Sequence, residues 1–275
     1  MLSADAAQAV PDMHDVHDVH DVHDVHDVPP MPQARMLQAL RSDGVLVFEG
    51  LLAHRIASAA DEHRRVTAGH FAGIRVSMEL DGEKIFVLGD DLLRAQGLRH
   101  LADMLAAPWF VALANDYLGT AEPAPHVYSI ALDGAKQAAD GPGNHHLHWD
   151  PTLSLRMMVY VGDTDRRNGA LEVIAGTHLL NHRRRLDEWA GGIAYQPRPV
   201  CAGRLEDTEV VEGRAGTVIV FDTSVSHRRG LVAPGHTRRV AFAHMHSALA
   251  AAQMAGMPHA QAADHLLWPH ATALP

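Results

Sequence analysis

Beyond residue 126 the chain consists of short apolar or alternating runs separated by Gly, Asp, Asn and Pro. Runs of this kind, bounded by turn-forming residues, are typical of β-strands. Eight can be recognised, at residues 127–132, 146–149, 153–161, 171–174, 210–211, 217–221, 227–232 and 238–246. Many short strands at such spacing predict a mainly β protein, either a barrel or a double-sheet jelly roll of the cupin-like, double-stranded β-helix kind.

The first half of the chain has a different pattern, with apolar residues at helical spacing. Helices are predicted at residues 35–40, 51–66 and 102–117, and further helical patterns follow at 183–189 and 248–267. Pro108 is expected to kink or bound the third helix, and Pro258 to break the last, because proline interrupts helical hydrogen bonding. The apolar run 45–48 predicts a strand. We expect the helices to flank the outer face of the β-structure.

The N-terminus is a low-complexity segment. Five tandem His-Asp-Val triplets run from His14 to Val28 and end at Pro29-Pro30. Residues 1–33 lack the apolar content for a core, so we expect a disordered tail before a single domain at 34–275. The triplets are either a metal-capturing segment or a repeat without a role. We favour the second interpretation, because a flexible tail loses conformational entropy when it binds.

Composition narrows the class of protein. The net charge is −10, but residues 1–34 contain seven aspartates and no Lys or Arg, so the folded part is close to neutral. The sequence contains no basic stripe with interleaved aromatic residues, so we expect no binding to nucleic acid. No apolar run approaches the about 18 residues of a membrane span. The single Cys201 excludes an internal disulfide and favours a reducing compartment, so we expect a cytoplasmic protein.

The candidate chemistry lies in His148-Trp149-Asp150 and in the distant His227. On a strand, residues two apart point to the same face, so His148 and Asp150 can share one site. Two imidazoles and one carboxylate form a facial triad for Fe(II) that leaves three coordination positions open. H-x-D alone is a weak signal in a chain with 22 histidines, and its weight comes from the downstream context.

Arg238 follows His227 by eleven residues, after a turn-like segment, and is expected on an adjacent strand. A guanidinium can grip a carboxylate with two parallel hydrogen bonds, which lysine cannot do. A dicarboxylate such as 2-oxoglutarate could therefore chelate the iron at one end and bind Arg238 at the other. The neighbouring Arg239 would point to the opposite face of a regular strand.

These features resemble the phytanoyl-CoA dioxygenase family of Fe(II)/2-oxoglutarate oxygenases, over roughly residues 36–247. The resemblance is carried by the triad, by the segment 168–178, which is similar to the family pattern N-G-x-L-x-V-x-x-G-S-H, and by the segment 216–222 leading to His227. It implies that His148, Asp150 and His227 bind iron and that Arg238 binds the distal carboxylate of 2-oxoglutarate. It departs from the family where Arg228-Arg229 replace the small residues common after the distal histidine.

The resemblance implies a dioxygenase that uses O2 and 2-oxoglutarate to hydroxylate, or otherwise oxidise, an unactivated C–H bond of a small-molecule substrate, with release of succinate and CO2. Desaturation, cyclisation and epoxidation are the other oxidations open to such an enzyme. Asp150 favours hydroxylation over halogenation, because halogenating relatives need a small residue there. We expect a substrate from specialised metabolism. Two alternatives use other chemistry: a redox-inert Zn or Ni cupin with the same triad, and a metal-storage protein that depends on the His-rich tail.

Other polar residues are assigned lesser roles. His145 and His146 are expected behind the metal ligands or at the surface, and His244 and His246 are expected to be structural. Arg183-Arg184-Arg185 are expected either to bind an anionic substrate group or to form a solvated face, and the second is the usual role of a run of charges. An anionic substrate would have to be met by arginine, and Arg156, Arg228 and Arg229 are candidates by position alone.

Overall fold

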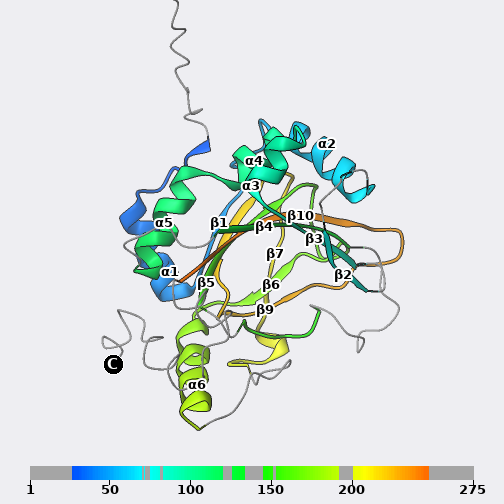
Figure 1. Ribbon diagram of the computed structural model, residues 1–275. Coiled ribbons are helices and arrows are strands. Elements are labelled where there is room, and N and C mark those ends of the chain that lie inside the picture. Colours follow the sequence, from blue (N-terminus) through cyan, green and yellow to red (C-terminus); the bar gives the residue numbers. More distant parts are fainter. Residues whose placement is uncertain are drawn as a thin grey trace, which may run out of the picture.

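The computed structural model describes residues 27–69, 71, 75–80, 83–119, 126–133, 145–150, 153–191 and 201–247. In these residues the chain forms two antiparallel sheets that pack against each other, and helices cover the outer side of the larger sheet (Figure 1). This architecture is the double-stranded β-helix that the strand pattern predicts.

The larger sheet has seven strands in the order β1-β8-β5-β10-β4-β3-β2. Their bounds are β1 Val45–Phe48, β2 Arg75–Leu80, β3 Glu83–Leu88, β4 His126–Asp133, β5 Ser154–Tyr160, β8 Val218–Asp222 and β10 Arg238–His246. β10 lies at the centre, where Phe242 is opposite Met158 of β5 and Ser129 of β4. The strand that carries Arg238 is therefore held along both edges.

The smaller sheet has three strands in the order β7-β6-β9, with bounds β7 Glu209–Val211, β6 Leu171–Ile174 and β9 Ser226–Arg229. A tight turn between β8 and β9 carries the chain from the larger sheet to the smaller one. This turn brings His227 to the interface of the two sheets.

Alternation along β5 explains why the two sheets pack in this way. Leu155, Met157 and Val159 belong to the apolar cluster beneath the helices, whereas Met158 and Tyr160 pack in a second cluster with residues of the smaller sheet. Side chains of a strand point alternately to its two faces. The even-numbered residues of β5 therefore point into the space between the sheets, where the candidate site lies.

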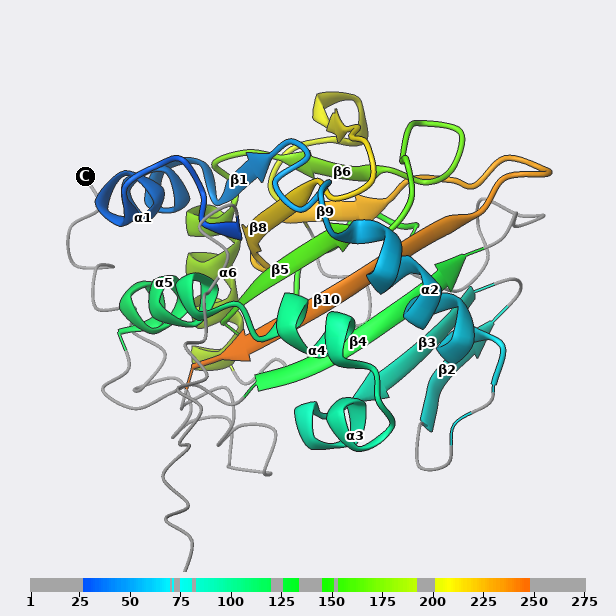
Figure 2. The same ribbon diagram turned by 90° about the horizontal axis from the view of Figure 1, so that it is seen from above.

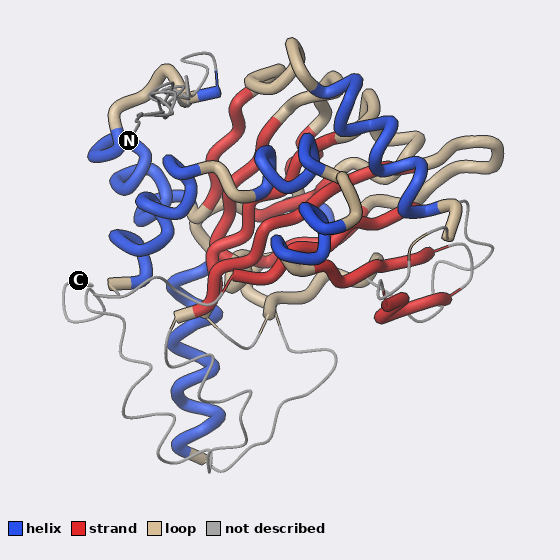
Figure 3. Tube along the Cα trace, turned by 45° about the horizontal axis from the view of Figure 1, so that its top comes forward, coloured by secondary structure: helices blue, strands red, loops and turns tan. Residues whose placement is uncertain are grey.

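Four helices lie over the outer face of the larger sheet (Figure 2): α2 Ile56–Thr67, α3 Asp90–Ala95, α4 Arg99–Leu105 and α5 Pro108–Leu118. Helix α1, Gln33–Asp43, packs beside α5 and the edge strand β1. The sixth, α6 His178–Ala190, follows β6 and extends away from the sheets (Figure 3). A 3-10 turn, Leu205–Asp207, precedes β7. None of the helices in the described part of the chain is long and apolar enough to cross a membrane.

The predicted bounds of β1 and β10 are confirmed, and several other predictions need correction. The helix predicted at 51–66 begins only at Ile56, because the preceding turn is tied to the start of β8 by the Leu52 N–H bond to the Gly216 carbonyl, 2.9 Å. The helix predicted at 102–117 is two helices, and Pro108 begins the second one. The helix predicted at 183–189 is longer.

The segment 146–149 was wrongly predicted as a strand: His148 forms an isolated bridge with His227. β2, β3 and α3 were not predicted. Residues 1–26, which include most of the His-Asp-Val triplets, and the predicted helical tail at 248–267 lie outside the described residues.

Candidate active site

The structure brings His148 and His227 directly opposite each other. The His148 N–H donates to the His227 carbonyl at 2.9 Å, and the His227 N–H donates to the His148 carbonyl at 2.8 Å. The two rings lie with their centroids 4.4 Å apart. This reciprocal pair joins the loop before β5 to strand β9, so backbone bonds fix the spacing of the two imidazoles.

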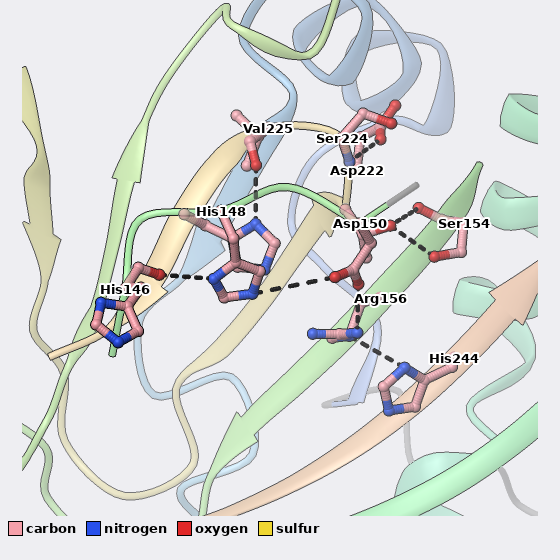
Figure 4. Close-up of polar contacts among 11 residues, drawn as sticks. His146, His148, Asp150, Ser154, Arg156, Asp222, Ser224, Val225 and His244 are labelled. Carbon is pink, nitrogen blue, oxygen red and sulfur yellow. Dashed lines mark hydrogen bonds and ion pairs between the residues drawn. The ribbon is translucent and has the colours of Figure 1, made fainter. Parts of the chain in front are cut away.

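Both imidazoles have the same tautomer. Nδ1 of His148 lies 2.7 Å from the His146 carbonyl, and Nδ1 of His227 lies 2.8 Å from the Val225 carbonyl (Figure 4). A carbonyl oxygen can only accept, so each Nδ1 carries a proton, and Nε2 is the nitrogen that can bind a metal when the ring is neutral. A backbone acceptor behind Nδ1 is the usual way in which proteins orient a metal-binding histidine.

Asp150 completes the cluster. Its N–H donates to the Thr223 carbonyl at 2.8 Å, which ties it to the turn between β8 and β9. Its Oδ1 lies 4.0 Å from Nε2 of His148, and its Oδ2 accepts from Nη2 of Arg156 at 2.8 Å. One potential ligand atom from each of His148, Asp150 and His227 lies within 4.8 Å of the others.

The electrostatics of the cluster suit a cation. Burial, followed by the neighbouring His148, lowers the pKa of His227 to about 3, so this imidazole is neutral at ordinary pH. Burial alone would raise the pKa of Asp150, but the Arg156 guanidinium and the two imidazoles outweigh it and hold the pKa below 3.8. The Nε2 atom of His227 is buried and makes no hydrogen bond within the described part of the protein. A bound metal would satisfy it.

The turn that carries His227 is held from several sides. Asp222 accepts the Tyr117 O–H at 2.7 Å and the Ser224 N–H at 2.7 Å. Thr177 accepts the Ser226 N–H at 2.8 Å, and Asn181 donates to the Ser224 carbonyl at 2.9 Å. Thr177 directly precedes α6 and Asn181 lies in its first turn. The start of α6 therefore supports the active site through the β8–β9 turn.

The Asn168-Gly169 pair has a structural role. The Asn168 side chain accepts the Asp165 N–H and donates to the Asp163 carbonyl, both at 2.6 Å, which closes the loop before β6. Gly169 has φ +81°, and a Cβ there would lie 2.9 Å from the Gly230 carbonyl oxygen. Only glycine allows this close approach of β6 to the end of β9.

A cavity that is open to solvent lies beside the cluster. His148, Asp150 and His227 line it together with three arginines, Arg156, Arg229 and Arg238, and its other lining residues are Ile85, Ala131, Met158, Leu171, Phe221 and Phe242. Arg238 is only 4% exposed, and its Nη2 lies 3.2 Å from Sδ of Met158. The cavity thus combines a metal-type donor set with buried cationic groups.

The other polar residues that the sequence singled out agree with their predicted roles in some cases and differ in others. Arg228 pairs with Glu172 at 2.7 Å, so its charge is already balanced. The Nε atom of Arg156 donates to Nδ1 of His244 at 3.0 Å, so His244 is part of the surroundings of the site. Arg185 is 3% exposed and pairs with Glu188, unlike the solvated arginine that was predicted there. Sequence reasoning missed the contact between Arg156 and Asp150, for which no local signal exists.

A jelly roll with two histidines and one aspartate beside a cationic cavity is typical of mononuclear non-haem iron oxygenases. The chain matches the family "Phytanoyl-CoA dioxygenase (PhyH)" over residues 40–240, which is most of its length. The protein therefore belongs to the phytanoyl-CoA dioxygenase family, a family of 2-oxoglutarate-dependent oxygenases whose cofactors are iron and 2-oxoglutarate.

Solved structures with the same fold are distant in sequence. The epimerase SnoN in complex with Fe3+, alpha ketoglutarate and nogalamycin RO has TM-score 0.52 and 19% identity, covering 78% of this chain and 83% of that one. EvdO2 from Micromonospora carbonacea var. aurantiaca, complexed with 2-oxoglutarate, has TM-score 0.53 and 15% identity, covering 80% and 93%. EctD from S. alaskensis with bound Fe has TM-score 0.52 and 18% identity, covering 79% and 78%. A comparison with curated protein sequences gave no match.

Proposed function

We propose that His148, Asp150 and His227 bind a single Fe(II), and that the enzyme hydroxylates an unactivated C–H bond of a small-molecule metabolite. The observation that carries this proposal is the donor set: one potential ligand atom from each of two imidazoles and one carboxylate, all within 4.8 Å of one another. Such a set suits Fe(II) and leaves coordination positions open for a bidentate cosubstrate and O2.

When bound, iron and 2-oxoglutarate supply the oxidising chemistry: O2 is consumed, 2-oxoglutarate is split into succinate and CO2, and one oxygen atom is transferred to the substrate. The residues of the chain prepare the site for this. The backbone acceptors behind His148 and His227 hold the Nδ1 side of each ring, so that each Nε2 is oriented toward the cluster. Because the pKa of His227 is about 3, metal binding displaces no proton from that ring near neutral pH.

Arg238 is proposed to bind the distal carboxylate of 2-oxoglutarate. It projects from the central strand β10 into the cavity that the three metal ligands also line, and it is almost fully buried. A buried guanidinium is best stabilised by an anionic partner, and a carboxylate matches its planar donor fork. Arg229 lines the same cavity and adds positive charge to it.

The substrate is proposed to be a small metabolite of specialised metabolism. The cavity combines apolar lining residues with a few polar and charged groups, as sites for small molecules do. Further support comes from SnoN, a structure of the same fold that is described as an epimerase from nogalamycin biosynthesis. Asp150 occupies the position that supplies the third protein ligand, and this supports hydroxylation.

The experiment is succinate release from 2-oxoglutarate after the apoprotein is loaded anaerobically with Fe(II) and exposed to air. Wild type is compared with Asp150→Ala, and Arg239→Ala serves as an exposed control on β10. Succinate formation that needs Fe(II) and is lost only in Asp150→Ala supports the proposal. Metal binding without any succinate would instead favour a redox-inert cupin.

A second arm separates the enzyme from a metal-storage protein. Deletion of residues 1–33 should leave succinate formation unchanged, since the proposed ligands all lie in the barrel. If the deletion abolished metal binding, the His-Asp-Val triplets would be the metal site and the proposal would be wrong.

A further inference from the structure

Arg156 lies beside Asp150 in the cavity and is held there by contacts with several strands (Figure 4). It projects from the inner face of β5, and its Nη2 lies 2.8 Å from Oδ2 of Asp150. Its Nε lies 3.0 Å from Nδ1 of His244 on β10. Its guanidinium carbon lies 5.5 Å from the ring centre of Phe221 and 5.7 Å from that of Phe242. With two hydrogen bonds and two ring contacts, the guanidinium has one preferred orientation.

This arrangement separates the two oxygens of Asp150. Oδ2 is held by Arg156, whereas Oδ1 lies on the side of His148, 4.0 Å from its Nε2. A carboxylate can bind a metal through one oxygen or through both. The hydrogen bond to Arg156 turns Oδ2 toward the guanidinium and leaves Oδ1 on the side of His148.

We propose that Arg156 is a positioning residue that orients the carboxylate of Asp150, so that Oδ1 is the oxygen presented to the metal. The inference rests on the proposed function. The backbone bond from Asp150 to Thr223 sets where the residue lies, and Arg156 sets how its carboxylate is rotated.

Two effects of Arg156 on iron binding have opposite signs, and this makes the inference testable. As a cation near the metal, Arg156 repels Fe(II), so its removal should strengthen binding if charge alone matters. As a positioning group, it orders the carboxylate, so its removal should weaken binding. Loss of a group that orients a metal ligand typically reduces metal affinity about 10–100-fold.

The test is the dissociation constant for Fe(II), measured without oxygen by competition with a chromogenic chelator in full-length protein. Arg156→Met removes the charge and the donor but keeps an unbranched stem between the two rings. Arg156→Lys keeps both the charge and an N–H donor. Arg239→Met is the matched control, because Arg239 is exposed on the outer side of β10. Visible absorption of the Fe(II) complex with 2-oxoglutarate is recorded for each variant.

We expect about 10–100-fold weaker Fe(II) binding and a shifted absorption band in Arg156→Met. We expect near-normal values in Arg156→Lys and Arg239→Met. If Arg156→Met bound Fe(II) as tightly as wild type or more tightly, the inference about Arg156 would be wrong, but the proposed function would stand. Failure of wild type to bind Fe(II) would overturn the proposed function as well. If Arg156→Met does not fold, Arg156→Gln, whose amide is too short to reach Asp150, is measured instead.

Discussion

Replacement of Arg238 should specifically weaken the binding of 2-oxoglutarate. Arg238 is 4% exposed, so a carboxylate bound to it would be removed from water. Loss of one partner of such a buried, hydrogen-bonded charge pair costs about 2–5 kcal/mol. Because about 1.4 kcal/mol corresponds to a tenfold change, Arg238→Met should weaken 2-oxoglutarate roughly 30-fold to several thousand-fold.

Arg238→Lys should fall between wild type and Arg238→Met, since it keeps the charge but not the two-pronged donor. The assay is titration of the Fe(II)-loaded protein with 2-oxoglutarate under nitrogen, together with the KM for 2-oxoglutarate in succinate release. Fe(II) affinity is measured in parallel and should be unchanged.

The exposed neighbour supplies the control for this prediction. Arg239→Met changes the same type of residue on the same strand but should leave the affinity unchanged. Equal 2-oxoglutarate affinity in Arg238→Met and Arg239→Met would refute the reasoning. If Arg229→Met lost the affinity instead, the anchoring role would belong to Arg229, which lines the same cavity.

Three further predictions concern the scaffold. Tyr117→Phe removes a 2.7 Å hydrogen bond to buried Asp222 and should lower the free energy of unfolding by about 1.5–3 kcal/mol in urea titrations, while an unchanged midpoint would contradict this. Burial is the main cause that lowers the pKa of His178 below 6.5 in the folded protein, so below pH 6.5 the unfolded state binds more protons than the folded state. The Tm of the apoprotein should therefore fall as the pH drops below 6.5. A Tm that stays constant there would contradict this prediction. Gly216→Ala should destabilise far more than Gly97→Ala in thermal unfolding. Both glycines have positive φ, but a Cβ at Gly216 would lie 2.4 Å from a backbone nitrogen, whereas a Cβ at Gly97 would meet nothing within 4 Å. Equal losses of Tm in the two variants would contradict this prediction.

The strand pattern was most informative where a strand has two different faces. β10 was predicted with its observed bounds because it alternates between the helix-covered face and the inner face. β2 and β3 were missed, although Asp81-Gly82 between residues 75–80 and 83–88 is a recognisable hairpin signal. Their apolar residues are mixed with charged ones, which hid the alternation.

The candidate ligands could be predicted from sequence, but their surroundings could not. His148, Asp150 and His227 stand in short motifs with metal-ligand chemistry, so residue type and context were sufficient to select them. The contact between Arg156 and Asp150 depends on how the loop before β5 folds back onto the turn between β8 and β9. The fixed tautomers depend on backbone carbonyls, which carry no residue-specific signal.

The most direct test of the central claim is anomalous X-ray diffraction at the iron absorption edge, from crystals grown without oxygen in the presence of Fe(II) and 2-oxoglutarate. The account predicts one iron peak per chain, bonded to Nε2 of His148, Nε2 of His227 and Oδ1 of Asp150, with 2-oxoglutarate extending from the iron to Arg238. An iron peak bound elsewhere, or none at these three residues, would contradict it.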